Sequence, residues 1–190
     1  MAATPSSRAT RIAKWSTIPV ALVISGVLVS QASHSAFSAT TDNPSNNWST
    51  GTVSLRDDDN GSAMFAVTNM KPGDTGSKCI TVTSDGTLPS DVKLYTANAS
   101  QTGGLDAHLN LTITKSASCG AQGETIYSGT AQGLTGSASS FATGIGTWGT
   151  AGTPGESNAY TITYTLAAET PNTAQGGTAS LDFVWEAQNK

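Results

Sequence analysis

Alternation of apolar and polar side chains at every second residue constrains the fold of this chain more than any other feature. Residues 160–166 show it most clearly, because aromatic and aliphatic side chains occupy one face and threonines occupy the other. The apolar face consists of Tyr160, Ile162, Tyr164 and Leu166. A period of two in segments rich in Val, Ile and Thr is typical of half-buried β-strands. Beyond the N-terminal segment the sequence shows no amphipathic run of helical period, so we predict an all-β fold.

The same alternation predicts further strands, at residues 52–55, 65–68, 79–83, 92–95, 109–114, 125–128 and 181–186. Turn residues separate them: Pro72-Gly73 suits the centre of a type II turn, and Asp85-Gly86 suits a tight hairpin. We therefore expect residues 65–95 to form three consecutive antiparallel strands at the centre of the fold. About eight short strands separated by turns predict a two-sheet antiparallel β-sandwich. Periodicity alone leaves a jelly-roll-like and an immunoglobulin-like topology open.

Residues 129–157 differ from the rest in composition, because Gly, Ser, Thr and Ala dominate them. The large apolar residues of this stretch are isolated: Leu134, Phe141, Ile145 and Trp148. A stretch this polar has too few apolar side chains for a core of its own. We predict long loops there, with one or two edge strands.

The chain opens with the pattern of an export signal. Basic residues precede an apolar stretch at residues 17–29, and small residues then offer cleavage sites near residues 32–36. The basic residues are Arg8, Arg11 and Lys14. We predict that residues 1–36 are a signal peptide and that residues 37–190 form a single β-sandwich domain.

An uncleaved membrane anchor is the alternative reading of the N-terminal segment. Its apolar stretch is shorter than the roughly 20 residues that a membrane-spanning helix needs. Pro19 and Gly26 also interrupt it. These features favour cleavage by signal peptidase and a secreted protein.

Cleavage would leave an acidic domain. The whole chain has 9 Lys and Arg against 13 Asp and Glu, a net charge of −4. Loss of the three basic residues of the signal segment leaves six basic residues against 13 acidic ones, a net charge of −7. Such a domain repels nucleic-acid phosphates and anionic lipid headgroups. Neither nucleic acid nor, after cleavage, a membrane is therefore expected as a partner.

Cys79 and Cys119 are the two cysteines of the chain. An even number of cysteines in an exported chain predicts one disulfide, which would stabilise the fold by roughly 4 kcal/mol. Free thiols and a pair of metal ligands are the alternatives. The sequence has neither a C-x-x-C spacing nor a histidine beside either cysteine, so it does not favour a metal site.

Candidate metal ligands and catalytic residues are few. Asp57, Asp59 and Gly61 form a D-x-D-x-G pattern that begins calcium loops, but the late Glu of such a loop is missing, and a solvated turn is the simpler reading. Of the two histidines, His34 lies in the predicted signal peptide, and His108 has no second His four residues on. The sequence has no H-E-x-x-H and no G-x-S-x-G motif. We therefore expect no catalytic, metal or cofactor site.

Several aromatic residues near the C-terminus could form an exposed platform for carbohydrate. They are Trp148, Tyr160, Tyr164, Phe183 and Trp185. Most of those in residues 160–166 and 181–186 share a face with aliphatic side chains. The alternation therefore predicts that they fill the core instead.

Three stretches of the sequence resemble the TasA/camelysin family of secreted bacterial surface and biofilm-matrix proteins. TNMKPGDTGSKCITVTSDGTLPSDVKLY (residues 68–95) is similar to the family's strand, PGD turn and second strand. SAFSATTDNPSNNWSTGTVSL (residues 35–55) resembles the start of its mature chain, and ASLDFVWEAQ (residues 179–188) its closing strand. The resemblance implies a jelly-roll-like topology and assembly into extracellular fibres or surface layers. Camelysin-like proteins are also catalogued as metallopeptidases, but this sequence lacks a recognisable set of zinc ligands.

These observations favour a secreted structural subunit that associates with copies of itself, or with other surface or matrix components, through unpaired strand edges. We expect residues 37–48, with the aromatic anchors Phe37 and Trp48, to be the donated strand. The alternative is a monomeric extracellular module that binds polysaccharide or protein through residues 129–157. A secreted metallopeptidase is the third hypothesis.

Overall fold

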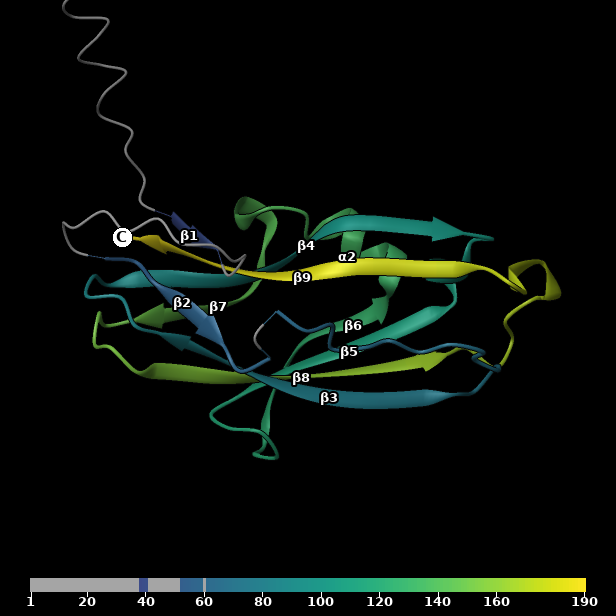
Figure 1. Cartoon of the computed structure of the whole chain (residues 1–190), viewed down its shortest axis with the longest axis horizontal. Coiled ribbons are helices and arrows are strands. Elements are labelled where there is room, and N and C mark those ends of the chain that lie inside the picture. Colours follow the sequence, from purple (N-terminus) through teal and green to yellow (C-terminus); the bar gives the residue numbers. More distant parts are fainter. Residues whose placement is uncertain (1–37, 41–51, 60) are drawn as a thin grey trace, which may run out of the picture. The chain divides into compact units, whose positions relative to one another are not determined.

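Two antiparallel sheets pack face to face in a computed structural model that describes residues 38–40, 52–59 and 61–190 (Figure 1). The four-stranded sheet has the order β1-β9-β4-β7, and the five-stranded sheet has the order β2-β3-β8-β5-β6. The strands are β1 (Ser38–Thr40), β2 (Leu55–Asp57), β3 (Thr75–Ser84), β4 (Ser90–Thr102), β5 (Leu109–Ser116), β6 (Gly123–Thr130), β7 (Ile145–Thr150), β8 (Glu156–Leu166) and β9 (Thr178–Asn189). The predicted all-β, two-sheet antiparallel sandwich is confirmed.

All described residues belong to one unit, Phe37–Lys190. The predicted signal peptide, residues 1–36, lies outside the described residues, as do Phe37 and Trp48. Within the described part of the chain, no helix has the length and apolar character to cross a membrane.

The alternating strands bury their apolar faces between the sheets, as predicted. Tyr160 and Trp185 are 0% and 2% exposed, and their ring centroids lie 5.3 Å apart. Burial raises the pKa of Tyr160, because the phenolate would lose its hydration. The other aromatic residues of the predicted set are half-buried and pack against the same cluster: Trp148, Tyr164 and Phe183. These side chains therefore belong to the core rather than to an exposed platform.

The prediction of three consecutive strands in one sheet is wrong. β3 pairs with β8 along its whole length, whereas β4 pairs with β7 and β9 in the other sheet. Residues 85–89 therefore cross between the sheets instead of closing a hairpin. Backbone bonds to the segment before β2 hold this crossing, since Asp85 N donates to Ser54 O and Thr87 N donates to Thr52 O. Repeated crossing between two sheets is the connectivity expected of a jelly-roll-like sandwich.

Residues 65–68 are also not a strand. They belong to a segment without regular structure that connects β2 to β3. Phe65 packs edge-on against Tyr164, with 5.2 Å between ring centroids, whereas Val67 is 46% exposed. The predicted turn at the end of this segment is confirmed: Asp74 N donates to Lys71 O over 2.9 Å, and Gly73 adopts a φ of 89°.

Residues 129–157 contain more regular structure than the sequence indicated. The predicted edge strand is present as β7, but the stretch also holds helix α2 (Ala131–Ser137) and a 3-10 turn at Phe141–Thr143. The hydroxyl of Thr130 caps α2 by accepting from Gly133 N, and Leu134 is fully buried. At the end of α2, the Ala138 carbonyl accepts from the backbone N and the hydroxyl of Thr96 on β4.

The turn between β7 and β8 depends on one carboxylate. Glu156 accepts hydrogen bonds from the backbone N of Ala151 and Thr153, at 3.0 and 2.8 Å. These bonds favour the charged form and lower the pKa of Glu156.

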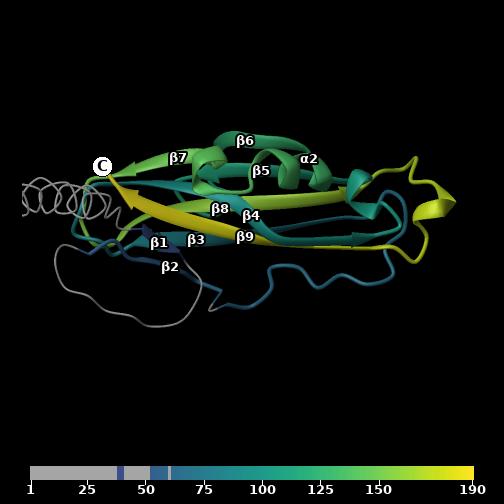
Figure 2. The same ribbon diagram turned by 90° about the horizontal axis from the view of Figure 1, so that it is seen from above.

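Seen from above (Figure 2), the two long sides of the sandwich differ. β2 and the segment that follows it lie along one side, and α2, β6 and β7 lie along the other.

Candidate functional site

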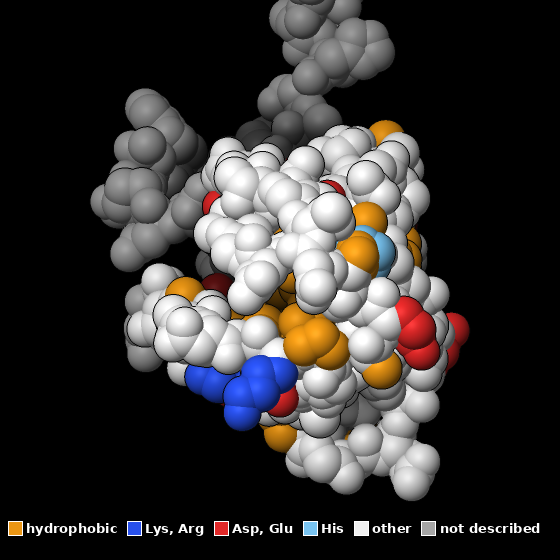
Figure 3. Space-filling view, turned by 90° about the vertical axis from the view of Figure 1, so that its right-hand side faces the viewer, with side chains coloured by type: hydrophobic (Ala, Val, Ile, Leu, Met, Phe, Trp, Pro, Cys, Tyr) orange, Lys and Arg blue, Asp and Glu red, His pale blue; other side chains and the backbone are white. Residues whose placement is uncertain are grey.

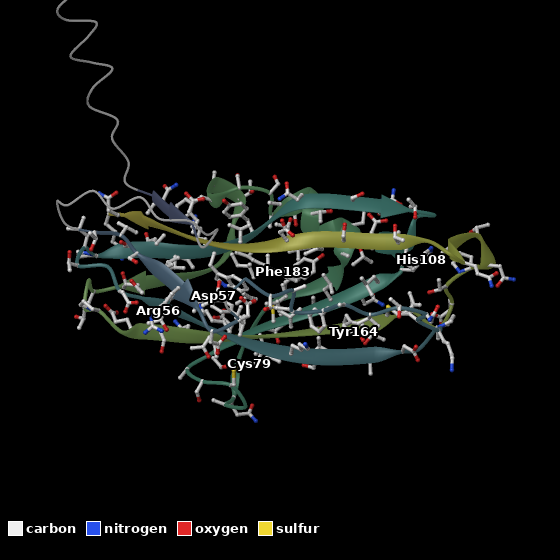
Figure 4. All side chains as sticks on the ribbon, viewed as in Figure 1. Arg56, Asp57, Cys79, His108, Tyr164 and Phe183 are labelled. Atoms are coloured by element: carbon white, nitrogen blue, oxygen red, sulfur yellow. A yellow bond between two sulfur atoms is a disulfide. The ribbon has the colours of Figure 1, made fainter. Side chains whose placement is uncertain are left out.

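A groove opens between the two sheets along the side that carries β2 and residues 61–70, with a volume of about 830 Å³. Both sheets contribute apolar side chains to it. These include Phe65, Ile80, Leu111, Tyr164, Leu181 and Phe183. Figure 3 shows hydrophobic side chains inside a hollow of the surface, and in Figure 4 Phe183 and Tyr164 lie between the sheets. The groove is therefore an opening into the apolar interior of the sandwich.

Tyr164 can occupy the groove because its neighbour on β3 has no side chain. Gly76 is the register partner of Tyr164, and a Cβ at Gly76 would lie 2.7 Å from the tyrosine ring. The ring therefore lies across the glycine, where Phe65 contacts it. Within the described residues, no backbone hydrogen bond joins residues 63–70 to a strand, so side chains such as Phe65 hold this segment over the groove.

The β9 edge of the groove is largely without a strand partner. β4 pairs with β9 on one side over almost its whole length. On the other side β1 pairs only with Glu186–Gln188. Among the described strands, none adjoins this side of β9 from Thr178 to Trp185, which leaves a row of backbone groups available for pairing.

The β3 edge of the groove is open in the same way. β2 pairs only with Val82–Ser84, at one end of β3. Asp58 Oδ1 accepts from Thr81 N over 2.9 Å and so occupies one further donor of this edge. No described strand adjoins residues 75–81 of β3 on this side. Two open strand edges, one from each sheet, therefore border one apolar groove.

The opposite side of the sandwich is sealed. Lys115 on β5 donates to the carbonyl oxygens of Gly146 and Thr147 on β7, at 3.4 and 3.0 Å. Ile126 on β6 lies so close to Gly146 that a Cβ there would come within 2.5 Å of its Cδ1. Gly146 also has a φ of 64°, a conformation that glycine adopts without strain. Contacts between β5, β6 and β7 thus tie the two sheets together on this side.

A buried carboxylate oxygen at the groove lacks a partner. Asp106 Oδ1 has no hydrogen-bond partner within the described residues, and Asp106 lines the groove. A buried polar group without a partner costs on the order of 1–3 kcal/mol. An occupant that offers an N–H or O–H donor at this position would remove that cost.

The predicted disulfide is present. Cys79 on β3 bonds to Cys119 in the β5–β6 hairpin, across 40 residues of sequence. β8 lies between β3 and β5, so the disulfide spans β8 on the outer face of the five-stranded sheet. A disulfide of this kind is consistent with an extracellular location.

The aspartates that suggested a calcium loop have other roles. Gly61 N donates to Asp59 Oδ1 over 2.9 Å, and Gly61 adopts a φ of 75°, as the turn interpretation predicted. Asp57 lines the rim of the groove. His108 directly precedes β5, as expected for a strand-end residue. In the part of the chain that the structure describes, no three His, Cys, Asp or Glu residues converge as a metal site would require.

Sequence reasoning missed the groove itself. It placed Phe65 in a strand and Tyr164 in a closed core, and it did not identify which strand edges stay open. The one local signal was Gly76, a glycine inside an alternating strand, which often marks a close approach of another group.

Fold and site together define an antiparallel β-sandwich closed by one disulfide, sealed along one side and open to strand addition along the other. The family model of camelysin metallo-endopeptidases matches residues 15–190, and the chain belongs to this family. No curated protein matches the chain.

Proposed function

We propose that the protein is a secreted structural subunit that assembles with copies of itself into fibres or a surface layer. The observation that carries this proposal is the pair of open edges, on β3 and β9, that border one apolar groove. An extended segment from a neighbour would pair with these backbone groups and cover the apolar side chains between them. Export follows from the predicted signal peptide, and the disulfide supports it.

The donated strand in this proposal is residues 37–48 of a neighbouring copy. The first part of this segment already pairs with β9 of its own chain, because Ser38–Thr40 pair with Glu186–Gln188 as β1. In the same register, a strand that continued to Trp48 would reach Thr178, the first residue of β9. The length of the segment therefore matches the length of the open edge. A neighbour's segment would replace β1 and extend its pairing.

Deletion of residues 37–47 from the processed protein tests this role. We expect a folded monomer that no longer polymerises, because the groove remains but the donated strand is gone. Circular dichroism checks the fold, and size-exclusion chromatography with electron microscopy checks assembly. A second variant that replaces the same residues by a Gly/Ser linker of equal length separates the loss of strand-forming residues from the loss of chain length. Fibres of unchanged length and number in both variants would exclude residues 37–47 as the donor.

A secreted peptidase is the second candidate, and the description of the family as metallo-endopeptidases favours it. This function requires a bound metal, with ligands that the described residues do not bring together as a group. Metal analysis of the purified protein, together with a casein-cleavage assay with and without chelator, decides between the two. Stoichiometric zinc with chelator-sensitive cleavage would establish the peptidase.

A further inference from the structure

The outer face of the five-stranded sheet carries an ordered array of neutral polar side chains. Residues in register form rows that run across the strands. One row consists of Ser77, Thr163, Thr112 and Ser128, on β3, β8, β5 and β6. The row on one side of it consists of Thr75, Thr165, Asn110 and Thr130, and the row on the other side consists of Cys79, Thr161, Thr114 and Thr125. None of these residues is charged, although the chain as a whole is acidic.

Much of the hydrogen-bonding capacity of this array is unused. Ser77 and Thr163 share one hydroxyl–hydroxyl bond of 2.9 Å. The hydroxyls of Thr112 and Ser128, both exposed residues, have no hydrogen bond to any other described residue. Each hydroxyl can donate one hydrogen bond and accept two. The central row therefore presents free donors and acceptors to a molecule that lies on the sheet.

The disulfide-linked β5–β6 hairpin borders this face on one side; we call the face with its bordering residues 117–122 the ledge. Because Cys119 bonds to Cys79 across β8, residues 117–122 lie against the sheet at one end of the array. Figure 1 shows the β5–β6 hairpin projecting below the five-stranded sheet, and Figure 4 places Cys79 beside it. All of residues 117–122 are exposed. A polymer chain that lay against residues 117–122 would follow the central row, across the strands.

We propose that this ledge binds a neutral, extended polysaccharide chain. Adjacent strands lie roughly 4.8 Å apart, which is close to the repeat of one sugar residue in an extended chain. Successive sugar rings would therefore each meet one hydroxyl of the row Ser77, Thr163, Thr112 and Ser128. The lack of charge on the rows fits a neutral polymer. A hydroxyl array without an aromatic side chain binds each sugar weakly, so the affinity comes from repetition along the chain.

The proposal concerns a different face from the groove and holds whether or not the protein polymerises. Its test is sedimentation of the processed protein with cellulose and with chitin as neutral, extended polysaccharides, and with alginate beads as an acidic one. The test variant is T112V/T163V, which removes two hydroxyls of the central row with little change in shape. The matched control is T147V, the same change at an exposed position on β7 of the other sheet. Thermal unfolding of all three proteins confirms that each is folded.

We expect the wild type and T147V to bind a neutral polysaccharide equally, and alginate not at all. T112V/T163V should bind more weakly by roughly fivefold for each hydroxyl removed. High salt should leave the binding unchanged, because no charge takes part. Failure to bind either neutral polysaccharide, or full binding by T112V/T163V, overturns the proposal. If the wild type sediments without polysaccharide and T112V/T163V does not, the proposal is also overturned. The face would then form contacts between copies of the chain.

Discussion

Replacing both cysteines by serine should destabilise the protein by about 4 kcal/mol. The disulfide closes a loop across 40 residues. In the chain-entropy description, a cross-link over a loop of that length lowers the free energy of folding by roughly 4 kcal/mol, because it restricts the unfolded chain. For a domain of this size, such a loss corresponds to a fall in Tm of roughly 8–16 °C.

Equilibrium urea unfolding of the wild type and of C79S/C119S measures the difference. Wild-type protein unfolded in the presence of a thiol reductant should match the double variant, because both lack the cross-link. S118A is the control within the same hairpin, since it keeps the disulfide and changes one exposed side chain. A double variant within about 1 kcal/mol of the wild type would refute the reasoning, because the unfolded chain would then gain no measurable freedom.

Three further predictions concern the core, the sealed side and the turn between β7 and β8. L134A should destabilise the fold by about 2–5 kcal/mol, because Leu134 is fully buried and its truncation leaves a cavity; urea unfolding measures this, and a loss below 1 kcal/mol contradicts it. G146A should destabilise by more than about 1 kcal/mol through its positive φ and its approach to Ile126. Thermal unfolding should show a smaller loss when G146A is introduced into I126A than when it is introduced into the wild type, because the close approach to Ile126 is then absent. Because the folded pKa of Glu156 lies below its unfolded value, its contribution to stability is present above the unfolded pKa and is lost as pH falls through the folded pKa. E156Q should therefore show a weaker loss of stability in acid than the wild type, and identical pH profiles would contradict this.

The alternation of side chains predicted which residues face the core, because a strand places every second side chain on the same face. β8 and β9 follow this rule, with Tyr160 and Trp185 buried. The rule says nothing about which strand lies next to which. β3 and β4 are consecutive in sequence but belong to different sheets. β3 pairs with β8 and β4 pairs with β9, and both partners lie far along the chain. Neighbouring strands could therefore not be assigned from local pattern.

The short helix α2 escaped prediction for a related reason. Its seven residues include two glycines, which are poor helix formers, and it is too short to show a helical period. Its stability comes from the cap at Thr130 and from the burial of Leu134 beneath it. The groove was equally hidden, because Phe65 reaches Tyr164 only when the whole sandwich is assembled. The disulfide, by contrast, followed from the even number of cysteines in a chain that opens with an export signal.

The pairing of β9 also determines when the chain can fold. β9 is the last strand of the sequence, yet it lies between β1 and β4 inside the four-stranded sheet. Until the ribosome has released residues 178–189, β4 lacks its longest partner and that sheet stays incomplete. Pairings so distant in sequence close slowly. The four-stranded sheet is therefore completed only by a pairing between strands that lie far apart along the chain.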